Sequence, residues 1–410
     1  MKIAARAPGG SRTSALVSGR EVRQAGRVTT DERVRLSFTG PDSHVLTRRP
    51  GVGSLTVGPR GGREKPDLVV GPDDPVDWTA LDGLLVPDGS PWPRYVRYEG
   101  ADTSFLTWSR SRPVEGITFS AVRDTVLDAD GAQIQQLHVR TEGHHVTLRM
   151  ASATTCRDLV VSGDLTRVEL HGHPDGTVPG LGIVLPAVPA GEPRGLPPLP
   201  ALAGVTSLDL RVDPLGAPFD CRTLLQLPGL RTLTLQGALA HLDALAELPL
   251  TSLAIRFCPD LTGLPPLTTW PGLTSLIAWN VDDQGGKRLR KELKTLGDDH
   301  FSDHVSVSQL RARRWFVEEY GLPFAAWPKS TAKDATRLFK AASAWIAKAS
   351  SEETVRTAVE TFVVGVGGLP GIETSEREDA AEAVRLLVST SPVPVEPETA
   401  QGWFDAVRSF

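Results

Sequence analysis

Four aligned segments near the middle of the chain place polar, charged and aromatic side chains between regularly spaced apolar residues. They begin at Val205, Leu230, Leu250 and Leu273, and each approximates the pattern L-x-x-L-x-L. In a strand, the residues between the apolar positions point to the opposite face. That face would carry arginines, amides, hydroxyls and a tryptophan, which are typical of binding surfaces. We predict that its partner-binding residues are Asp209, Arg211, Thr234, Gln236, Arg256, Ile277 and Trp279.

A structural role is the alternative for the most prominent of these residues. A helix is expected to begin near Lys287, directly after the last segment. That helix could cover Trp279, and Arg211 and Arg256 could be solvated charges with no partner to bind. The sequence leaves both interpretations open.

A basic cluster after the four segments is a second candidate surface. Lysines and arginines displace the counterions of phosphate groups, and a nearby aromatic such as Trp315 can stack on a base. Acidic residues, among them Glu292 and Asp303, lie within the same stretch and favour a solvated helix face or one that docks acidic helices. The possible nucleic-acid contacts are Lys287, Arg288, Arg290, Lys291, Arg311, Arg313 and Arg314.

Histidines gather in the segment HGH, where His171 and His173 would share one face of a strand. Aligning Val146 with Val168 places Arg149 beside His171. A guanidinium group at this position would repel a cation. We therefore predict no metal site, and nothing in the sequence indicates a cofactor.

Known catalytic motifs are not found: the sequence has no G-x-S-x-G, H-E-x-x-H, Walker or dinucleotide-binding pattern. Its cysteines, Cys156, Cys221 and Cys258, are too few and too scattered for a disulfide framework or a zinc site, which fits a reducing compartment. We predict that the protein is not an enzyme. An unrecognised active site built from scattered Asp, Glu or Tyr side chains is the alternative.

The four segments start 25, 20 and 23 residues apart and closely resemble leucine-rich repeats, in which each coil adds one short strand and a return segment. The resemblance implies an α/β repeat fold, a β-solenoid whose inward leucines, such as Leu208, Leu233 and Leu253, stack on one another. Cys258 falls where this family places Asn or Cys to bond the turning backbone.

Bacterial effector ubiquitin ligases also join leucine-rich repeats to a helical C-terminal domain, in which a cysteine accepts ubiquitin. This chain has no cysteine after Cys258, so the resemblance does not extend to that chemistry. The stretches GIETSEREDAAEAVRLL and WFDAVRSF resemble C-terminal segments of uncharacterised actinobacterial leucine-rich-repeat proteins. That resemblance implies no activity.

The same period continues toward the N-terminus, so we expect nine coils between Val96 and Leu276. Second strands, HVTLRM from His145 and LTRVELHG from Leu165, would make this half β-rich. The alternative is a separate β-sandwich over residues 30–185. The apolar residues expected to align are Val96, Ile117, Leu137, Leu159 and Ile183, which advance by 20 to 24 residues.

From about residue 285 the apolar residues follow a helical period, and we predict helices over 287–297, 309–321, 332–350, 352–366, 376–388 and 398–410. In the third of these, Leu338, Trp345 and Ile346 would share the face that packs into a bundle. Ser350 and Ser375 are expected to be helix N-caps, and Pro397 is expected to lie in the first turn of the last helix.

The formal net charge of −5 argues against a protein whose whole body coats nucleic acid. The N-terminal residues lack the apolar run of a secretory signal, and no stretch is apolar enough to span a membrane, so we expect a cytoplasmic location. We predict a partly disordered cap at 1–50, a leucine-rich-repeat-like β-solenoid at 51–285, and a helical C-terminal domain at 286–410. The expected function is non-enzymatic recognition of a protein or peptide through the strand face, and nucleic-acid binding through residues 287–315 is the alternative.

Overall fold

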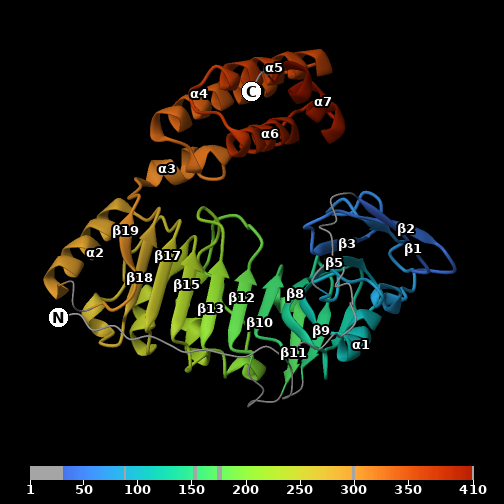
Figure 1. The fold of residues 1–410 in the computed structure, drawn as a ribbon. Coiled ribbons are helices and arrows are strands. Elements are labelled where there is room, and N and C mark those ends of the chain that lie inside the picture. Colours follow the sequence, from blue (N-terminus) through green and yellow to red (C-terminus); the bar gives the residue numbers. More distant parts are fainter. Residues whose placement is uncertain (1–30, 87–88, 151–154, 173–177, 298–300, 409–410) are drawn as a thin grey trace, which may run out of the picture.

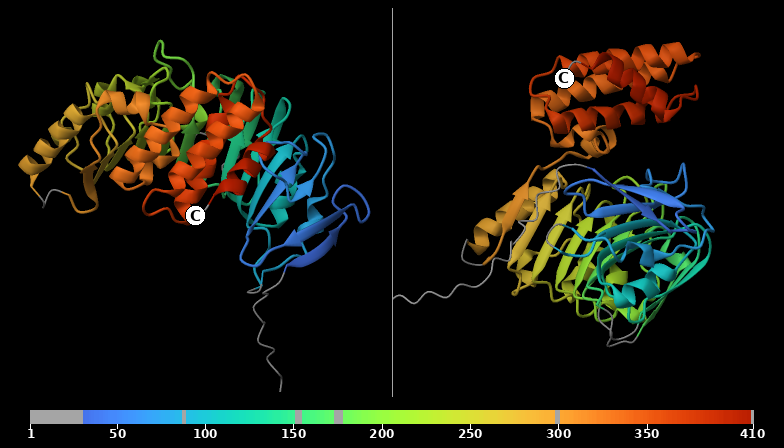
Figure 2. Two further views of the ribbon diagram at one scale, coloured as in Figure 1. Left: turned by 90° about the horizontal axis from the view of Figure 1, so that it is seen from above. Right: turned by 45° about the vertical axis from the view of Figure 1, so that its right-hand side comes forward.

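The computed structural model describes residues 31–410 except for 87–88, 151–154, 173–177, 298–300 and 409–410 (Figure 1). It shows a mixed α/β chain in which a long parallel sheet is followed by helices. Seen from above, the strands of the long sheet follow an arc (Figure 2).

Twelve of the described strands form the long sheet, and all neighbouring strands in it are parallel. From one edge to the other they are β4 (Leu68–Val69), β3 (Ser54–Gly58), β5 (Tyr95–Gly100), β6 (Val114–Ala121), β8 (Ile134–Arg140), β10 (Asp158–Ser162), β12 (Gly180–Val184), β13 (Ser207–Arg211), β15 (Thr232–Gln236), β17 (Ser252–Arg256), β18 (Ser275–Trp279) and β19 (Val305–Ser308).

The four aligned sequence segments are neighbouring strands of this sheet in the expected register. Leu208 pairs with Leu233, which in turn pairs with Leu253, and all three side chains are buried. Inward and outward residues alternate because side chains in a strand point to opposite faces in turn. The buried leucines therefore fix the outward position of the polar residues between them.

The upstream register agrees with the sequence prediction except at one residue. Leu159 pairs with Leu181, whereas Ile183 pairs with Val161. The expected alignment of Ile183 with Leu159 is therefore wrong by two residues. Both Leu181 and Ile183 are buried, because a shift of two residues leaves a side chain on the same face of the sheet.

The long sheet is continuous from its N-terminal strands to its C-terminal strands. Within the described part of the chain, nine of its strands run from β5 to β18, which is the number expected from the spacing. Strands from residues 54–184 and from residues 207–308 belong to one sheet, which contradicts the alternative of a separate β-sandwich.

A smaller parallel sheet accompanies the N-terminal half. It contains β7 (Thr125–Asp128), β9 (Val146–Met150) and β11 (Val168–Gly172), and Val146 pairs with Val168 as expected. The helix α1 (Ser104–Ser111) and the short turn η1 (Trp78–Leu81) pack beside it, with Phe105 and Trp78 buried in the core. A hairpin of β1 (Glu32–Leu36) and β2 (His44–Arg48) precedes both sheets.

The segments that return the chain between later strands are short helical turns, as expected. They are η3 (Pro200–Leu202), η4 (Cys221–Gln226), η5 (Leu242–Glu247) and η6 (Leu267–Thr269). The proline-rich stretch after β12 contributes Leu196 and Leu199 to the buried core. That stretch therefore packs against the sheet instead of linking two separate units.

The edges of the long sheet are covered by neighbouring elements. At one edge, Nε2 of His44 donates a hydrogen bond of 2.7 Å to the carbonyl of Val69 on β4. At the other, Nε of Arg290 donates one of 3.0 Å to the carbonyl of Val307 on β19. Arg290 belongs to α2 (Asp283–Leu296), whose residue Leu289 is buried in the core of the sheet.

The remaining helices form a bundle that stands at the carboxyl ends of the strands (Figure 1). They are α3 (Arg313–Glu318), η8 (Pro323–Ala326), α4 (Lys329–Ile346), α5 (Glu352–Gly367), α6 (Thr374–Ser389) and α7 (Pro397–Val407). Buried apolar residues of this bundle form a second core, which includes Phe324, Phe362 and Phe404 and shares no residue with the first.

Several details of the helices differ from the sequence prediction. The helix expected over 309–321 is confined to Arg313–Glu318, because Gln309 has a positive φ and Arg311 forms a β-bridge with Asp282; the residues Val305–Ser308 before them form the unpredicted strand β19. The helix α5 is capped by Ser351 and α6 by Glu373, so Ser350 and Ser375 are not the caps; Pro397 does lie in the first turn of α7.

The predicted packing face of α4 is only partly correct. Ile346 is buried and Leu338 packs against the second core, whereas Trp345 is 44% exposed. Trp345 lies seven positions, about two helical turns, after Leu338, so these two side chains lie on one side of α4, at the border of the face on which Ile346 is buried.

Candidate binding face of the parallel sheet

The outward side chains of the long sheet lie in three rows that cross the strands. Each row contains one residue from each strand, because the parallel register aligns equivalent positions. From β5 to β18, the first row is Tyr95, Gly116, Gln136, Asp158, Gly180, Ser207, Thr232, Ser252 and Ser275. The middle row is Arg97, Thr118, His138, Val160, Gly182, Asp209, Thr234, Ala254 and Ile277. The third row, at the carboxyl ends, is Glu99, Ser120, Arg140, Ser162, Val184, Arg211, Gln236, Arg256 and Trp279.

All seven residues predicted to bind a partner lie on this one face. Three of them, Asp209, Thr234 and Ile277, belong to the middle row. The other four belong to the third row, where Arg211 and Arg256 are exposed. The structure thus brings the predicted residues together, and their role in binding stays a prediction.

Arg211 is held in place by its own strand. Its Nε and Nη2 atoms donate hydrogen bonds of 3.2 and 2.9 Å to the two carboxylate oxygens of Asp209. This paired contact raises the pKa of Arg211 and fixes the plane of the guanidinium group. A partner would therefore meet an oriented side chain.

Trp279 is partly covered, though not by the helix expected to cover it. Its ring packs edge-on against Phe257, with 4.9 Å between the ring centroids. Phe257 in turn stacks on Trp315 of α3 and contacts Tyr320. The aromatic cluster Phe257, Trp279, Trp315 and Tyr320 therefore joins the end of the sheet to the start of the bundle. The hydroxyl of Tyr320 also forms a hydrogen bond with the side chain of Gln236.

The outward face is hollowed along the half that the sequence analysis left unassigned. A hollow with a volume of about 590 Å³ extends from β3 to β13. Two glycines on β12 help to open it, because Gly180 and Gly182 have no side chain to cover the neighbouring strand. A Cβ atom at Gly182 would lie 2.9 Å from a methyl group of Val160. Among the seven predicted residues, Asp209 and Arg211 line this hollow.

Sequence reasoning missed several polar residues that also line the hollow, among them Tyr95, Arg97, His138 and Asp158. They occupy outward positions in the upstream strand segments, such as YVRYEG and QQLHVRT. The same alternation rule that identified Arg211 would have identified them.

His138 lies in the middle row, on the floor of this hollow. Its Nε2 atom is 2.6 Å from the hydroxyl oxygen of Ser162. Burial, together with the positive charges of Arg140 and Arg63, lowers the pKa of His138 to about 4. The imidazole is therefore neutral at physiological pH, while the charges around it are positive.

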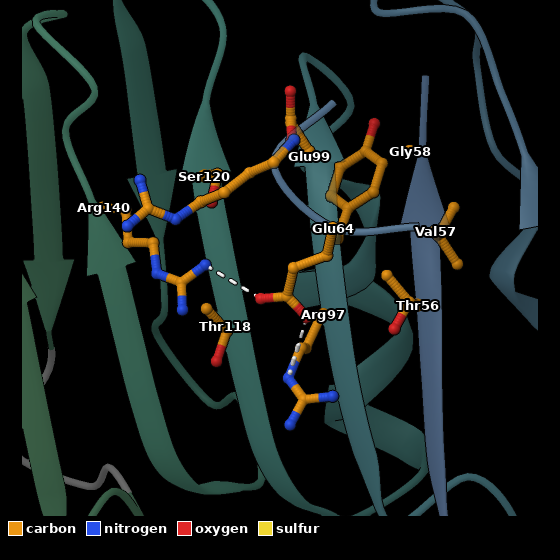
Figure 3. Close-up of a pocket in the computed structure, with 11 residues that line it drawn as sticks. Thr56, Val57, Gly58, Glu64, Arg97, Glu99, Thr118, Ser120 and Arg140 are labelled. Atoms are coloured by element: carbon orange, nitrogen blue, oxygen red, sulfur yellow. Dashed lines mark hydrogen bonds and ion pairs between the residues drawn. The ribbon is translucent and has the colours of Figure 1, made fainter. Parts of the chain in front are cut away.

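One end of the hollow carries a bridged pair of arginines (Figure 3). Glu64, from the loop after β3, lies between Arg97 of β5 and Arg140 of β8. Each guanidinium group contacts a different carboxylate oxygen of Glu64, at 3.4 and 3.2 Å. Glu64 and Arg97 line a small pocket with Thr118 and Ser120, and Arg97 also lines the hollow.

The predicted nucleic-acid contacts are divided between internal and exposed positions. Three of them bind the chain itself: Arg288 donates to the carbonyl of Leu264, Arg290 to that of Val307, and Arg311 to the side chain of Asn280. Lys287 pairs with Asp283. The exposed side chains without such internal bonds among the described contacts are Lys291, Arg313 and Arg314.

The described cysteines are poor candidates for nucleophiles. Cys156, Cys221 and Cys258 are all buried. Burial raises the pKa of Cys156 to about 11 and that of Cys258 to about 12, and it also raises that of Cys221. The thiolate form is the reactive one, and it is scarce at neutral pH. Cys258 instead donates to the carbonyl of Asp260 at 3.0 Å, within the turn after β17.

The histidines of the smaller sheet have the surroundings that the sequence indicated. His171 pairs in register with Arg149 and lies 3.1 Å from Glu169. His173 lies outside the described residues. Among the residues that the structure describes, no group of three or more His, Cys, Asp or Glu side chains could hold a metal ion. No helix in the same described ranges has the length and apolar character to cross a membrane.

These features were compared with known proteins. No family model, curated protein or solved structure matches the chain.

Proposed function

We propose that the chain is a non-enzymatic recognition scaffold that holds an extended segment of a protein partner across the outward face of the long sheet. The observation that carries this proposal is the hollow, whose lining includes outward residues of each successive strand from β3 to β13. Its polar groups are spread along the surface instead of converging on one point, as side chains of a catalytic centre would.

The dimensions of the face suit an extended peptide. From β5 to β13 the sheet has five strand-to-strand steps, which at about 4.8 Å each span about 24 Å. An extended peptide of about seven residues covers this distance at roughly 3.3 Å per residue. Because hydrogen-bonded strands hold the lining residues, little conformational freedom is lost when a partner binds.

The proposal includes the architecture that the sequence resemblance implied. We propose that the long sheet and its short returns form a leucine-rich-repeat type of β-solenoid, which acts in the cytoplasm. The pairing of Leu208, Leu233 and Leu253 at equivalent positions supports it. Two contacts in the turns also support it. The side chain of Asp213 accepts a hydrogen bond from the backbone N–H of Leu215, and the thiol of Cys258 donates one to the carbonyl of Asp260.

The test is affinity capture from a lysate of the native host with the double variant Arg211→Glu, Arg256→Glu. Both side chains are exposed on the outward face, so the exchange reverses its charge with little effect on the core. We expect a protein captured by the wild type to bind the variant at least about tenfold more weakly, since hot-spot residues contribute 2 kcal/mol or more. Nuclease treatment should not change the capture.

The matched control is the double variant Arg337→Glu, Arg385→Glu, which makes the same charge change on the surface of the bundle. It should capture the partner as the wild type does. Capture that survives the Arg211, Arg256 exchange would contradict the proposed face. Nuclease-sensitive capture would favour the basic cluster at 287–315, and the capture of nothing would favour an enzyme.

A further inference from the structure

The bridged arginines have the geometry of a binding site for a carboxylate. Arg97 and Arg140 lie on strands separated only by β6, and both point to the outward face. Their guanidinium groups contact the two oxygens of one carboxylate, with the hydroxyl residues Thr118 and Ser120 of β6 in the same pocket. Guanidinium groups bind planar anions of this kind through charge-assisted hydrogen bonds.

The carboxylate in this site comes from a loop that is weakly attached. None of residues 59–66 is buried, so no apolar side chain anchors the loop in the core. Apart from Glu64, the loop is held by Arg63, whose side chain lies 3.0 Å from Glu142 and whose backbone N–H donates to Glu99. The side chains of Arg63 and Glu142 are 58% and 39% exposed, and an ion pair this exposed contributes little to stability.

The arginines would attract another anion if Glu64 left. Among the ion pairs of the described residues, Glu64 is the carboxylate that pairs with both Arg97 and Arg140. Burial is the main cause of the depressed pKa of the adjacent His138, and the positive charge of Arg140 lowers that pKa as well. Arg97 is 48% exposed and borders both the small pocket and the hollow, so a bound peptide could reach it.

We infer that Arg97 and Arg140 form a carboxylate-binding site for an acidic peptide, and that Glu64 occupies this site as an internal competitor until the peptide displaces it. This inference rests on the proposed function, because it assumes that a peptide lies in the hollow. It adds the chemical class of the partner, a segment with a carboxylate near the β5 end of the hollow, and a means by which the empty scaffold lowers its own affinity.

The experiment measures the binding of three acetylated seven-residue glycine–serine peptides to the full chain. One has three central glutamates and an amidated end, one has no acid but a free C-terminal carboxylate, and one is neutral and amidated. Dissociation constants are obtained at low salt from the NMR signals of the arginine Nε–H groups. The first two peptides distinguish a side-chain carboxylate from a terminal one.

We expect Glu64→Gln to bind at least one of the two acidic probes about tenfold more tightly than the wild type. If the carboxylate of Glu64 fills the site about nine-tenths of the time, only about one-tenth of the molecules can bind the peptide, and the apparent affinity is about tenfold lower. Adding Arg140→Gln, or separately Arg97→Gln, should remove the gain, and the neutral peptide should show none. The matched control Glu360→Gln removes one arginine-paired carboxylate from the bundle and should leave the affinity unchanged.

Two results would overturn the inference. The first is an affinity of Glu64→Gln for both acidic probes that equals that of the wild type, including the case in which neither protein binds them. The second is a gain in affinity that remains both when Arg140→Gln is added and when Arg97→Gln is added. A gain in affinity that also appears in Glu360→Gln would overturn the inference in the same way. In either case, continued capture of a partner through Arg211 and Arg256 would show that the proposed function stands without this site.

Discussion

At the scale of single residues, His138 links the outward face to the pH dependence of stability. Its pKa in the folded chain is about 4, mainly because of burial, whereas its ordinary value is 6.5. Between these pH values the unfolded chain binds a proton that the folded chain does not. The stability that neutral His138 contributes is therefore complete above about pH 6.5 and is lost as the pH falls toward 4.

We expect the urea midpoint of the wild type to fall more steeply between pH 6.5 and pH 4 than that of His138→Gln. Glutamine keeps a polar group near Ser162 but does not titrate. The measurement is a series of urea unfolding curves for both proteins over this range. Parallel pH profiles would contradict the lowered pKa that partial burial gives His138.

Residue-level prediction from the sequence succeeded where local alternation decides the outcome. Asp209 and Arg211 face outward because Leu208 and Leu210 must be buried, and both facts follow from the period of a strand. The position of Glu64 could not be predicted in this way. It depends on a loop that crosses to strands 33 and 76 residues later in the chain, at Arg97 and Arg140.

At the scale of elements, the aromatic cluster Phe257, Trp279, Trp315 and Tyr320 connects the sheet to the bundle. Trp315 is buried, stacks on Phe257 and carries the guanidinium group of Arg311 over its ring at 4.4 Å. The short helix α3 places Trp315 at this position. This contact was not foreseen, because the sequence VSVS at 305–308 alternates as a strand does but was taken as the connection before a longer helix.

We expect Trp315→Ala to loosen this connection and to cost about 3–5 kcal/mol locally, the usual effect of removing a large buried ring. Limited proteolysis should then cleave residues 308–328 faster, while far-ultraviolet circular dichroism stays nearly unchanged. Trp345→Ala, which removes a half-exposed ring of α4, is the control. Equal cleavage rates for the wild type and Trp315→Ala would contradict the connecting role.

At the scale of the whole molecule, two hydrophobic cores that share no residue stabilise the chain. The first extends along the sheet and includes α2, although the sequence placed residues from 286 onward with the helical part. The boundary was hard to predict because α2 has the period of a bundle helix, and only tertiary packing shows that Leu289 joins the sheet.

We expect two components in the calorimetric unfolding of the chain, because separate cores unfold as separate cooperative units. Leu235→Ala, in the sheet, should lower the temperature of one component, and Phe362→Ala, in the bundle, should lower that of the other. Each substitution should cost about 2–5 kcal/mol in its own unit. A single transition that shifts equally with both variants would contradict independent cores.

The hydrogen bonds at the two edges of the long sheet bear on its tendency to self-associate. A parallel sheet that repeats one register could add strands from other molecules indefinitely, as amyloid fibrils do. Here His44 occupies the carbonyl of Val69 at one edge, and Arg290 occupies that of Val307 at the other. The carbonyl of His304 accepts from the backbone N–H of Leu276 and therefore faces β18. Carbonyl groups alternate in direction along a strand, so the carbonyl of Val307, three residues later, faces the free edge. Each of these two side chains thus occupies one acceptor that an incoming strand would need, and we expect this to disfavour the addition of further strands at both edges.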